Sequence, residues 1–233
     1  GVYLSTKMPF PSDKEIEDGA KVYLLTSTID DLSTMVDGEI KSWKIVNRYV
    51  IEKEGEPLEK LDFYYGMILH DRKNREGDCG IIRSFGTNYP TTNVEEVTIS
   101  ESNQNKPASI TVFREVEAKE ANVGKVILYS GEERTGDNLS LEWPTTEEKD
   151  LPPILWENVW SIEIRKGNYL LFLRGKNAIG TPMCATFERS VPSLKGLLIN
   201  QCVGPHPEED PWWKFWRLYD KSCAQAYALF LTK

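Results

Sequence analysis

The sequence predicts an all-β protein. Three observations support this fold class: a hydrophobic period of two, regular turn sequences, and no long amphipathic helix before the C-terminal tail. Residues 109–114, 138–143 and 159–164 alternate apolar with polar side chains and are rich in β-branched and aromatic residues. This pattern is typical of strands with one buried face. Segments rich in Gly and acidic residues, such as residues 131–137, separate these strands and indicate tight turns.

Composition and charge narrow the class of protein. The 233 residues include 40% hydrophobic and 27% charged side chains, which excludes a disordered chain and is enough to build a folded core. Asp and Glu number 36 against 28 Lys and Arg, giving a net charge of -8, so the phosphate backbone of a nucleic acid would repel the chain. The longest apolar runs, such as residues 196–199, fall far short of the roughly 20 residues of a membrane-spanning helix. We expect a globular protein without a nucleic-acid partner.

An internal repeat organises the predicted strands. Residues 67–78 and residues 126–137 each contain an apolar strand that ends in a ring-bearing residue, followed at identical spacings by Arg, Gly and Asp. A third copy begins at Leu170, and a weaker fourth copy, without the glycine, begins at Val22. Their positions group the four copies into two pairs. The sequence therefore predicts two units, each built from two related motifs.

This repeat resembles the Greek-key motif of the βγ-crystallins. In that family an aromatic residue lies seven positions before a glycine, and the glycine adopts a positive φ in a hairpin that folds back over the sheet. Tyr129 and Gly136 match this pattern fully, whereas His70 with Gly77 matches the spacing and not the aromatic residue. Leu173, with its glycine at position 180, also matches the spacing only.

The resemblance implies two Greek-key β-sandwich domains, each formed by two four-stranded sheets. We expect a degenerate crystallin-like sandwich over residues 20–118 and a more family-like one over residues 124–203. Residues 1–19 are then an N-terminal arm, and residues 204–233 are an aromatic-rich C-terminal extension. The linker between the domains is expected at residues 117–123.

The cysteines predict the compartment. An even number of cysteines without a CxxC spacing favours two disulfides over a zinc site, and three pairings are possible. The pairing that we favour is Cys202–Cys223, which closes a loop of about twenty residues and contributes on the order of 3 kcal/mol, with Cys79–Cys184 as the second bond, between the two domains. Disulfides and a first residue other than Met predict a secreted, extracellular protein, and four buried thiols in a cytosolic protein are the alternative. The triplet Asn138-Leu139-Ser140 is the chain's only N-glycosylation sequence, although such triplets also arise by chance.

The sequence contains no recognisable catalytic motif. His70 lies at a predicted strand end, where the best copy of the repeat has an aromatic residue, and we expect it to be structural. His206 lies between two prolines and is followed by acidic residues, which is typical of an exposed connector. A nucleophile elbow, a phosphate-binding glycine loop and a zinc-protease motif are all missing. We therefore predict a protein that is not an enzyme and has no cofactor.

Calcium is the one ligand that the resemblance implies, because many βγ-crystallins bind it through Asn, Asp and Ser or Thr side chains in a short run that ends in serine. In the copy that ends at Ser161, Trp156 and Trp160 replace two of these ligands. In another copy, aligned on Glu96, Glu95 replaces the hydroxyl ligand. The acids that remain as candidate ligands are Glu95, Asp137 and Glu157, with Asp78 as a further one. Because neither copy is intact, we expect calcium to contribute little.

The C-terminal tail is the strongest candidate for a binding surface. Trp212, Trp216, Tyr219, Cys223, Ala226 and Phe230 follow a helical spacing, with Asp210 and Pro211 placed to start a helix. A strand over residues 227–231 is the alternative, and periodicity cannot separate the two. We expect Trp212 and Trp216 to be buried. Trp213 lies off the stripe and is our candidate contact with a partner.

These observations predict a secreted, non-enzymatic protein that binds another protein in an extracellular fluid or matrix. The resemblance leaves a second class of function open, because crystallin-like domains also occur in pore-forming assemblies. In that case the tryptophans would contact a membrane or a glycan surface. The sequence does not identify the partner.

Overall fold

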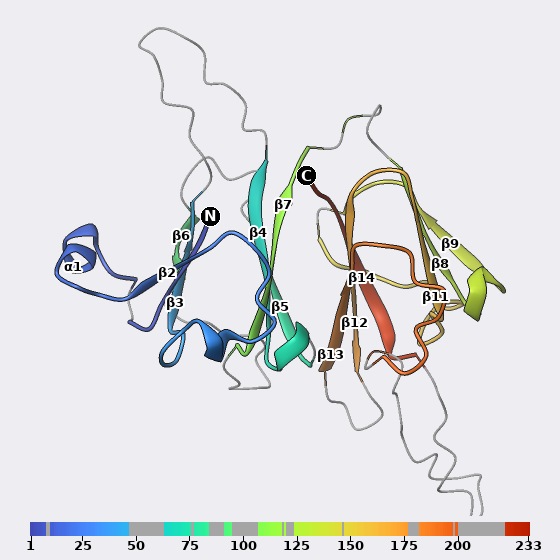
Figure 1. Ribbon diagram of the computed structural model, residues 1–233. Coiled ribbons are helices and arrows are strands. Elements are labelled where there is room, and N and C mark those ends of the chain that lie inside the picture. Colours follow the sequence, from blue (N-terminus) through green and yellow to red (C-terminus); the bar gives the residue numbers. More distant parts are fainter. Residues whose placement is uncertain are drawn as a thin grey trace, which may run out of the picture. The chain divides into compact units, whose positions relative to one another are not determined.

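The computed structural model describes residues 1–7, 10–46, 63–75, 77–83, 91–94, 107–117, 119, 124–145, 147–176, 182–197, 199 and 222–233 (Figure 1). The all-β prediction is confirmed, because the described residues form β-strands in four antiparallel sheets with almost no helix. The chain divides into two compact units. Unit 1 comprises Gly1–Arg75, Cys79–Glu117 and Lys233, and unit 2 comprises Glu76–Asp78 and Ala118–Thr232.

The first sheet of unit 1 has the strand order β2-β1-β3-β6. Its strands are β1 (Val2–Ser5), β2 (Val22–Leu25), β3 (Ser42–Ile45) and β6 (Thr91–Val94), and neighbours run antiparallel. The prediction of an N-terminal arm over residues 1–19 is therefore wrong, because β1 is an inner strand with strands on both sides. The repeat copy that the sequence places at Val22 is β2, which follows β1 in the chain and pairs with it. Four residues are too few for a periodicity to identify β1.

The second sheet of unit 1 has the order β5-β4-β7, with β4 (Tyr64–His70), β5 (Cys79–Arg83) and β7 (Ser109–Glu115). Residues 66–70 of β4 are all buried, so both faces of this strand are covered. A strand buried on both faces needs a continuous apolar run and not an alternating one, as β4 has. Side chains from both sheets and the segment between β2 and β3 form one hydrophobic core, which consists of Val2, Leu4, Leu25, Leu32, Val36, Ile40, Trp43, Ile45, Met67, Leu69, Ile110 and Val112.

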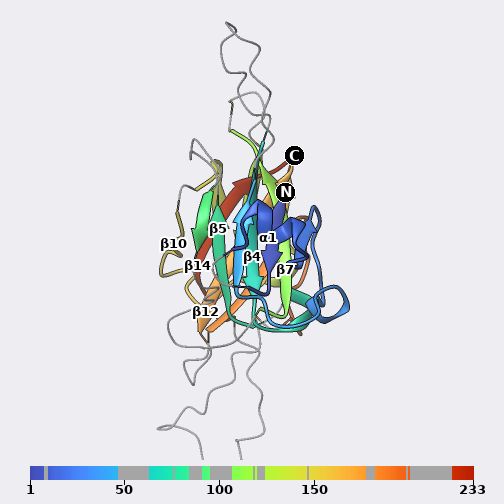
Figure 2. The same cartoon turned by 90° about the vertical axis from the view of Figure 1, so that its left-hand side faces the viewer.

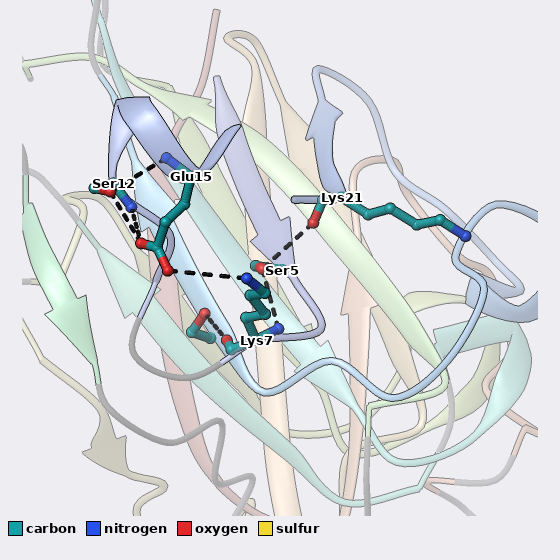
Figure 3. A network of polar contacts seen from close by, with 6 residues as sticks. Ser5, Lys7, Ser12, Glu15 and Lys21 are labelled. Carbon is teal, nitrogen blue, oxygen red and sulfur yellow. Dashed lines mark hydrogen bonds and ion pairs between the residues drawn. The ribbon is translucent and has the colours of Figure 1, made fainter. Parts of the chain in front are cut away.

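A short helix, α1 (Asp13–Glu17), packs its polar cap against the end of β1 (Figure 3). The Glu15 backbone N–H donates to Ser12 Oγ at 3.4 Å, and the Ser12 backbone N–H donates to Glu15 Oε2 at 2.9 Å, which completes a capping box. The other Glu15 oxygen lies 3.8 Å from Lys7 Nζ, and the Lys7 backbone N–H donates to Ser5 Oγ at 3.1 Å. These contacts connect the helix start to the strand end. Figure 2 shows α1 from its exposed side.

Unit 2 also contains two sheets. The first has the order β11-β8-β9, with β8 (Lys125–Tyr129), β9 (Asn138–Leu141) and β11 (Ser161–Arg165). The second has the order β10-β14-β12-β13. Its strands are β10 (Lys149–Asp150), β12 (Tyr169–Lys176), β13 (Pro182–Phe187) and β14 (Ala224–Leu231). Leu170, Leu171, Phe172 and Leu173 are all buried, so β12 is covered on both faces, as β4 is in unit 1.

The end of the chain forms β14, an inner strand between β10 and β12. The helical prediction for Cys223, Ala226 and Phe230 is therefore wrong, and the strand alternative is correct. Leu229, Phe230 and Leu231 are consecutive and all buried. A continuous apolar run of this kind matches a helical stripe as well as a buried strand, so periodicity cannot tell them apart. The predicted extension over residues 204–233 consequently contributes a strand to a sheet of unit 2, whereas Trp212, Trp213 and Trp216 lie outside the described residues.

Candidate functional site

Two hairpins, one in each unit, have the same folded backbone. In unit 2 the β8–β9 hairpin contains a single 3-10 turn, η4 (Glu132–Arg134), and Gly136 adopts a φ of 76°. In the β4–β5 hairpin, whose two strands belong to unit 1, the turn η2 (Lys73–Arg75) is followed by Gly77, which adopts a φ of 85°. The predicted need for a positive φ at both glycines is confirmed. The last two residues of each turn also adopt the left-handed backbone conformation, with positive φ: Asn74 and Arg75 in η2, Glu133 and Arg134 in η4.

A buried serine on the neighbouring strand holds each folded hairpin. In unit 2, Ser161 Oγ donates to the Gly131 carbonyl at 2.6 Å and accepts from the Arg134 N–H at 3.0 Å. In unit 1, Ser109 Oγ donates to the Arg72 carbonyl at 2.6 Å and accepts from the Arg75 backbone N–H at 2.9 Å. Both serines are fully buried. We call this pair of hydrogen bonds the serine clasp.

The serine clasp corrects the sequence alignment of unit 1. Ser109 on β7 makes the contacts that Ser161 makes on β11, so Ser109 and not Glu96 is the residue equivalent to Ser161. The sequence alone could not align the two serines, because the number of residues between the hairpin and the serine differs between the two units. The residue that precedes Ser109 is Ala108, which has no hydroxyl group to offer a cation. The predicted ligand Glu95 lies outside the described residues.

The other predicted calcium ligands lie in unit 2. Asp137 is exposed in the folded hairpin, and its backbone N–H donates to Ser130 Oγ at 2.8 Å. Glu157 Oε1 accepts a hydrogen bond from Gln225 Nε2 at 2.8 Å. Neither acid belongs to a group of three or more potential metal-ligating side chains in the described part of the chain. The structure thus gives no cluster around which these acids would share an ion.

Trp160 occupies the position of the hydroxyl ligand in the calcium pattern and contacts a nearby asparagine. Its indole N–H donates to Asn158 Oδ1 at 3.1 Å. Asn158 itself stands at a position of the pattern that any residue can fill, so it is not one of the required ligands. The indole of Trp160 therefore replaces the hydroxyl ligand with a group that donates a hydrogen bond and offers no oxygen to an ion.

His70 is fully buried at the end of β4. Its Nε2 lies 3.1 Å from Thr111 Oγ1, and Thr111 is also fully buried. Burial, with a smaller contribution from the positive charge of Arg75, lowers the pKa of His70 from 6.5 to about 4. The imidazole is therefore neutral at pH 7. In this conformation the ring has no exposed surface at which a substrate could exchange a proton with it.

The cysteines follow the disulfide prediction as far as the structure describes them. Cys79 and Cys184 form a disulfide, as predicted. Cys223 is also disulfide-bonded and fully buried, and its predicted partner, Cys202, lies outside the described residues. No cysteine in the described residues is a free thiol. These sulfur atoms are consequently not thiolate ligands for a metal ion.

Among the described residues of unit 2, the most exposed large apolar side chains lie on, or just before, the segment that runs beside β14. This segment follows β14 from the Thr145 N–H, which donates to the Leu229 carbonyl at 2.8 Å, to the Glu157 N–H, which donates to the Ala224 carbonyl at 2.7 Å. Exposed side chains on and near it are Trp143 (52% exposed), Ile154 (51%) and Trp156 (43%).

A tight turn presents two of these side chains. We define the Trp156 turn as residues 152–158. Its backbone is fixed because the N–H groups of Leu155 and Trp156 both donate to the Pro152 carbonyl, at 2.9 and 3.0 Å. Leu155 is fully buried, whereas Ile154 and Trp156 on either side of it are exposed. The buried leucine anchors the turn, and its two neighbours face solvent in a defined position.

Sequence reasoning noticed Trp156 only as a lost calcium ligand. The signal that could have identified the turn is the apolar run Leu151-Pro152-Pro153-Ile154-Leu155-Trp156, which is too rich in proline for a core strand. The sequence-based candidate, Trp213, lies outside the described residues. The structure therefore does not test the prediction for Trp213, and it adds the Trp156 turn as a second candidate surface.

Comparison with known proteins adds no identity: neither the protein-family models nor the curated proteins contain a match to this chain. Within the described residues, no helix is both long and apolar enough to cross a membrane.

Proposed function

We propose that this chain is a non-enzymatic, secreted binding protein, that it is built from two crystallin-like Greek-key sandwiches, and that it recognises another extracellular protein through the Trp156 turn. The single observation that carries this function is the pair of exposed side chains, Ile154 and Trp156, held on a turn whose backbone is fixed. Each part of the proposal has its own support.

Strand exchange supports the Greek-key architecture. In unit 2, β10 lies between β9 and β11 in sequence, yet it joins the other sheet beside β14. In unit 1, β6 lies between β5 and β7 in sequence and likewise joins the other sheet, beside β3. The fourth strand of each set, β11 or β7, then returns to lie beside the first, β8 or β4, which is the connection that distinguishes a Greek key from a simple meander. Together with the shared serine clasp, it favours the crystallin-like family over other β-sandwiches.

The exposed tryptophan supports binding to a protein. Tryptophan is the residue type most enriched among the side chains that contribute most to protein–protein affinity. A large apolar side chain on a rigid turn loses little conformational entropy when a partner covers it, so more of its burial energy appears as affinity. Ile154 beside Trp156 enlarges the apolar surface that a partner would bury.

Two further observations support the remaining parts of the proposal. The burial of His70 and Thr111 supports a non-enzymatic protein, because this pair is the one His–hydroxyl contact among the described hydrogen bonds and a substrate has no access to it. The Cys79–Cys184 disulfide supports an oxidising, extracellular compartment, where such bonds persist.

A capture experiment tests the class of ligand. The disulfide-bonded full chain and its Trp156→Ala variant are immobilised side by side and exposed to extracellular fluid of the source organism, and bound proteins are identified by mass spectrometry. We expect a protein that the native chain retains and the variant loses. Parallel arms measure binding to liposomes and to a glycan array. If Trp156→Ala abolishes liposome or glycan binding and no protein depends on Trp156, the protein-binding function is wrong and the membrane or lectin alternative holds.

A further inference from the structure

The sequence triplet Asn138-Leu139-Ser140 lies on β9, at the edge of the β11-β8-β9 sheet. The strand alternates in burial: Asn138 and Ser140 are exposed, Leu139 is half-buried and Leu141 is buried. Residues two apart on a strand point to the same face. The acceptor amide of Asn138 and the hydroxyl of Ser140 therefore both face solvent, on the side away from the core.

From this placement we propose that Asn138 carries an N-linked glycan and that the glycan covers the free edge of β9. The proposal rests on the extracellular location proposed above, because N-glycosylation takes place in the secretory pathway. A modifying enzyme can therefore reach the acceptor side chain and the hydroxyl of the triplet from the same, solvent-exposed face of the strand. The position also gives the glycan room, because no hydrogen bond among the described residues uses the side-chain amide of Asn138.

The reaction transfers a preassembled oligosaccharide from a polyisoprenyl diphosphate donor. The amide nitrogen, Asn138 Nδ2, attacks the anomeric carbon of the first sugar, and an N–C glycosidic bond forms. The C–O bond between that carbon and the diphosphate breaks, and the lipid diphosphate leaves with the electron pair. The amide nitrogen gives up one proton, and no atom is oxidised or reduced. Ser140 takes part in recognition of the triplet and is unchanged.

The second part of the proposal follows from the place of β9 in its sheet. One side of β9 pairs with β8, from Val126↔Leu141 to Tyr129↔Asn138, and no described strand pairs with its other side. An unpaired strand edge offers its N–H and C=O groups to another chain and promotes edge-to-edge association. A large hydrophilic group at the first residue of β9 would block this approach.

The test expresses the full chain with a signal peptide in insect cells and compares it with three variants. We expect an intact mass larger than the polypeptide mass, and its loss on treatment with an amidase that releases N-glycans and converts the carrier asparagine to aspartic acid at position 138. Asn138→Gln and Ser140→Ala should abolish the modification. Asn168→Gln, which changes an exposed asparagine outside any such triplet, should retain it. An unmodified native chain that is secreted with its disulfides formed would overturn the proposal.

Edge protection has its own readout. Light scattering over a concentration series should show more self-association for Asn138→Gln than for the glycosylated chain. Ser140→Lys removes the same triplet but places a charge on the edge, and it should remain monomeric without a glycan. Equal association of all three proteins would overturn the covering role of the glycan.

Partner capture is measured on the same samples to separate this proposal from the proposed function. An unmodified chain that still loses its partner on Trp156→Ala contradicts only the glycan. A modified chain with no Trp156-dependent partner contradicts only the binding function.

Discussion

The two folded hairpins share a backbone and differ in the side chain at one position. His70 in unit 1 and Tyr129 in unit 2 each lie seven residues before the positive-φ glycine. Tyr129 donates its hydroxyl to Glu163 at 2.7 Å, and His70 contacts Thr111 at 3.1 Å. Thr111 and Glu163 are also equivalent, because each lies two residues after the clasp serine. The polar partner is fully buried in unit 1 and half-buried in unit 2.

This difference separates what the motif needs from what it tolerates. Both hairpins keep the buried serine, the two hydrogen bonds to backbone and the glycine with positive φ, because these groups fix the backbone. The ring-bearing position tolerates a tyrosine or a histidine, because either ring can end the strand and find a polar partner on the next one. The consequence is that unit 1 carries at this position a buried group that titrates in mild acid, whereas burial and the hydrogen bond to Glu163 raise the pKa of Tyr129 in unit 2 above its ordinary value of 10.0.

The largest expected difference between the two units is their stability in acid, which should fall in unit 1 and not in unit 2. The pKa of His70 is about 4 in the folded chain against 6.5 when unfolded, so the unfolded state binds the proton first as the pH falls. This loss of stability is absent above pH 6.5, grows as the pH falls and is complete below about pH 4. Unit 1 has then lost on the order of 3 kcal/mol of its free energy of unfolding, at about 1.4 kcal/mol per pKa unit. Hydrogen exchange of β4 and β8 amides between these pH values measures each unit separately.

His70→Gln provides the control for this prediction, because glutamine can contact Thr111 without titrating. We expect the acid-dependent loss of protection in β4 to be much smaller in this variant. Equal acid sensitivity of β4 in both proteins would show that another group is responsible.

Removing the clasp serines should affect both units to the same extent. Ser161→Ala and Ser109→Ala each remove two partly buried hydrogen bonds to the hairpin backbone, and we expect a loss of about 1–3 kcal/mol in the unit concerned. Denaturant unfolding followed by hydrogen exchange assigns the loss to one unit. Ser27→Ala, at an exposed serine outside both hairpins, is the matched control and should change stability little. A clasp variant as stable as this control would mean that the shared contacts do not hold that hairpin.

The hairpin glycines should give a smaller effect. At Gly136, where φ is 76°, an added Cβ would lie 2.5 Å from Ser130 Oγ, so Gly136→Ala adds a steric contact to backbone strain. We expect a loss of about 1–2 kcal/mol. Gly196→Ala, also at positive φ but with no atom within 4 Å of the added Cβ, measures the strain alone. If both variants lose the same free energy, the Ser130 contact contributes nothing.

Calcium should have the smallest effect of all. The indole of Trp160 engages Asn158, and Ala108 precedes Ser109, so each unit lacks a ligand that the family pattern requires. The melting temperature in millimolar calcium should match that in chelator. An ion that binds the folded state raises the melting temperature, and a rise of many degrees would contradict this interpretation of both sites.

The sequence predicted unit 2 better than unit 1, and the reasons are physical. Residues 126–137 carry the whole motif within one short stretch, so the hairpin and its glycine could be predicted. Ser109 could not be assigned, because a serine in a strand is identified as a clasp only by what it contacts. β1 was missed because it is short, and β14 was ambiguous because both of its faces are buried. The Trp156 turn was not predicted, because a loop has no regular period from which the burial of Leu155 and the exposure of its two neighbours could be derived.

The measurement that tests the proposed binding function most directly is a paired one, of affinity and of thermal stability. Titration calorimetry compares the captured partner's affinity for the native chain, for Trp156→Ala and for Trp143→Ala, the last being a more exposed tryptophan outside the turn. The account predicts that Trp156→Ala weakens binding by at least about tenfold, as an interface hot spot does, with an unchanged melting temperature, and that Trp143→Ala changes neither. Native affinity in the Trp156→Ala variant would contradict it.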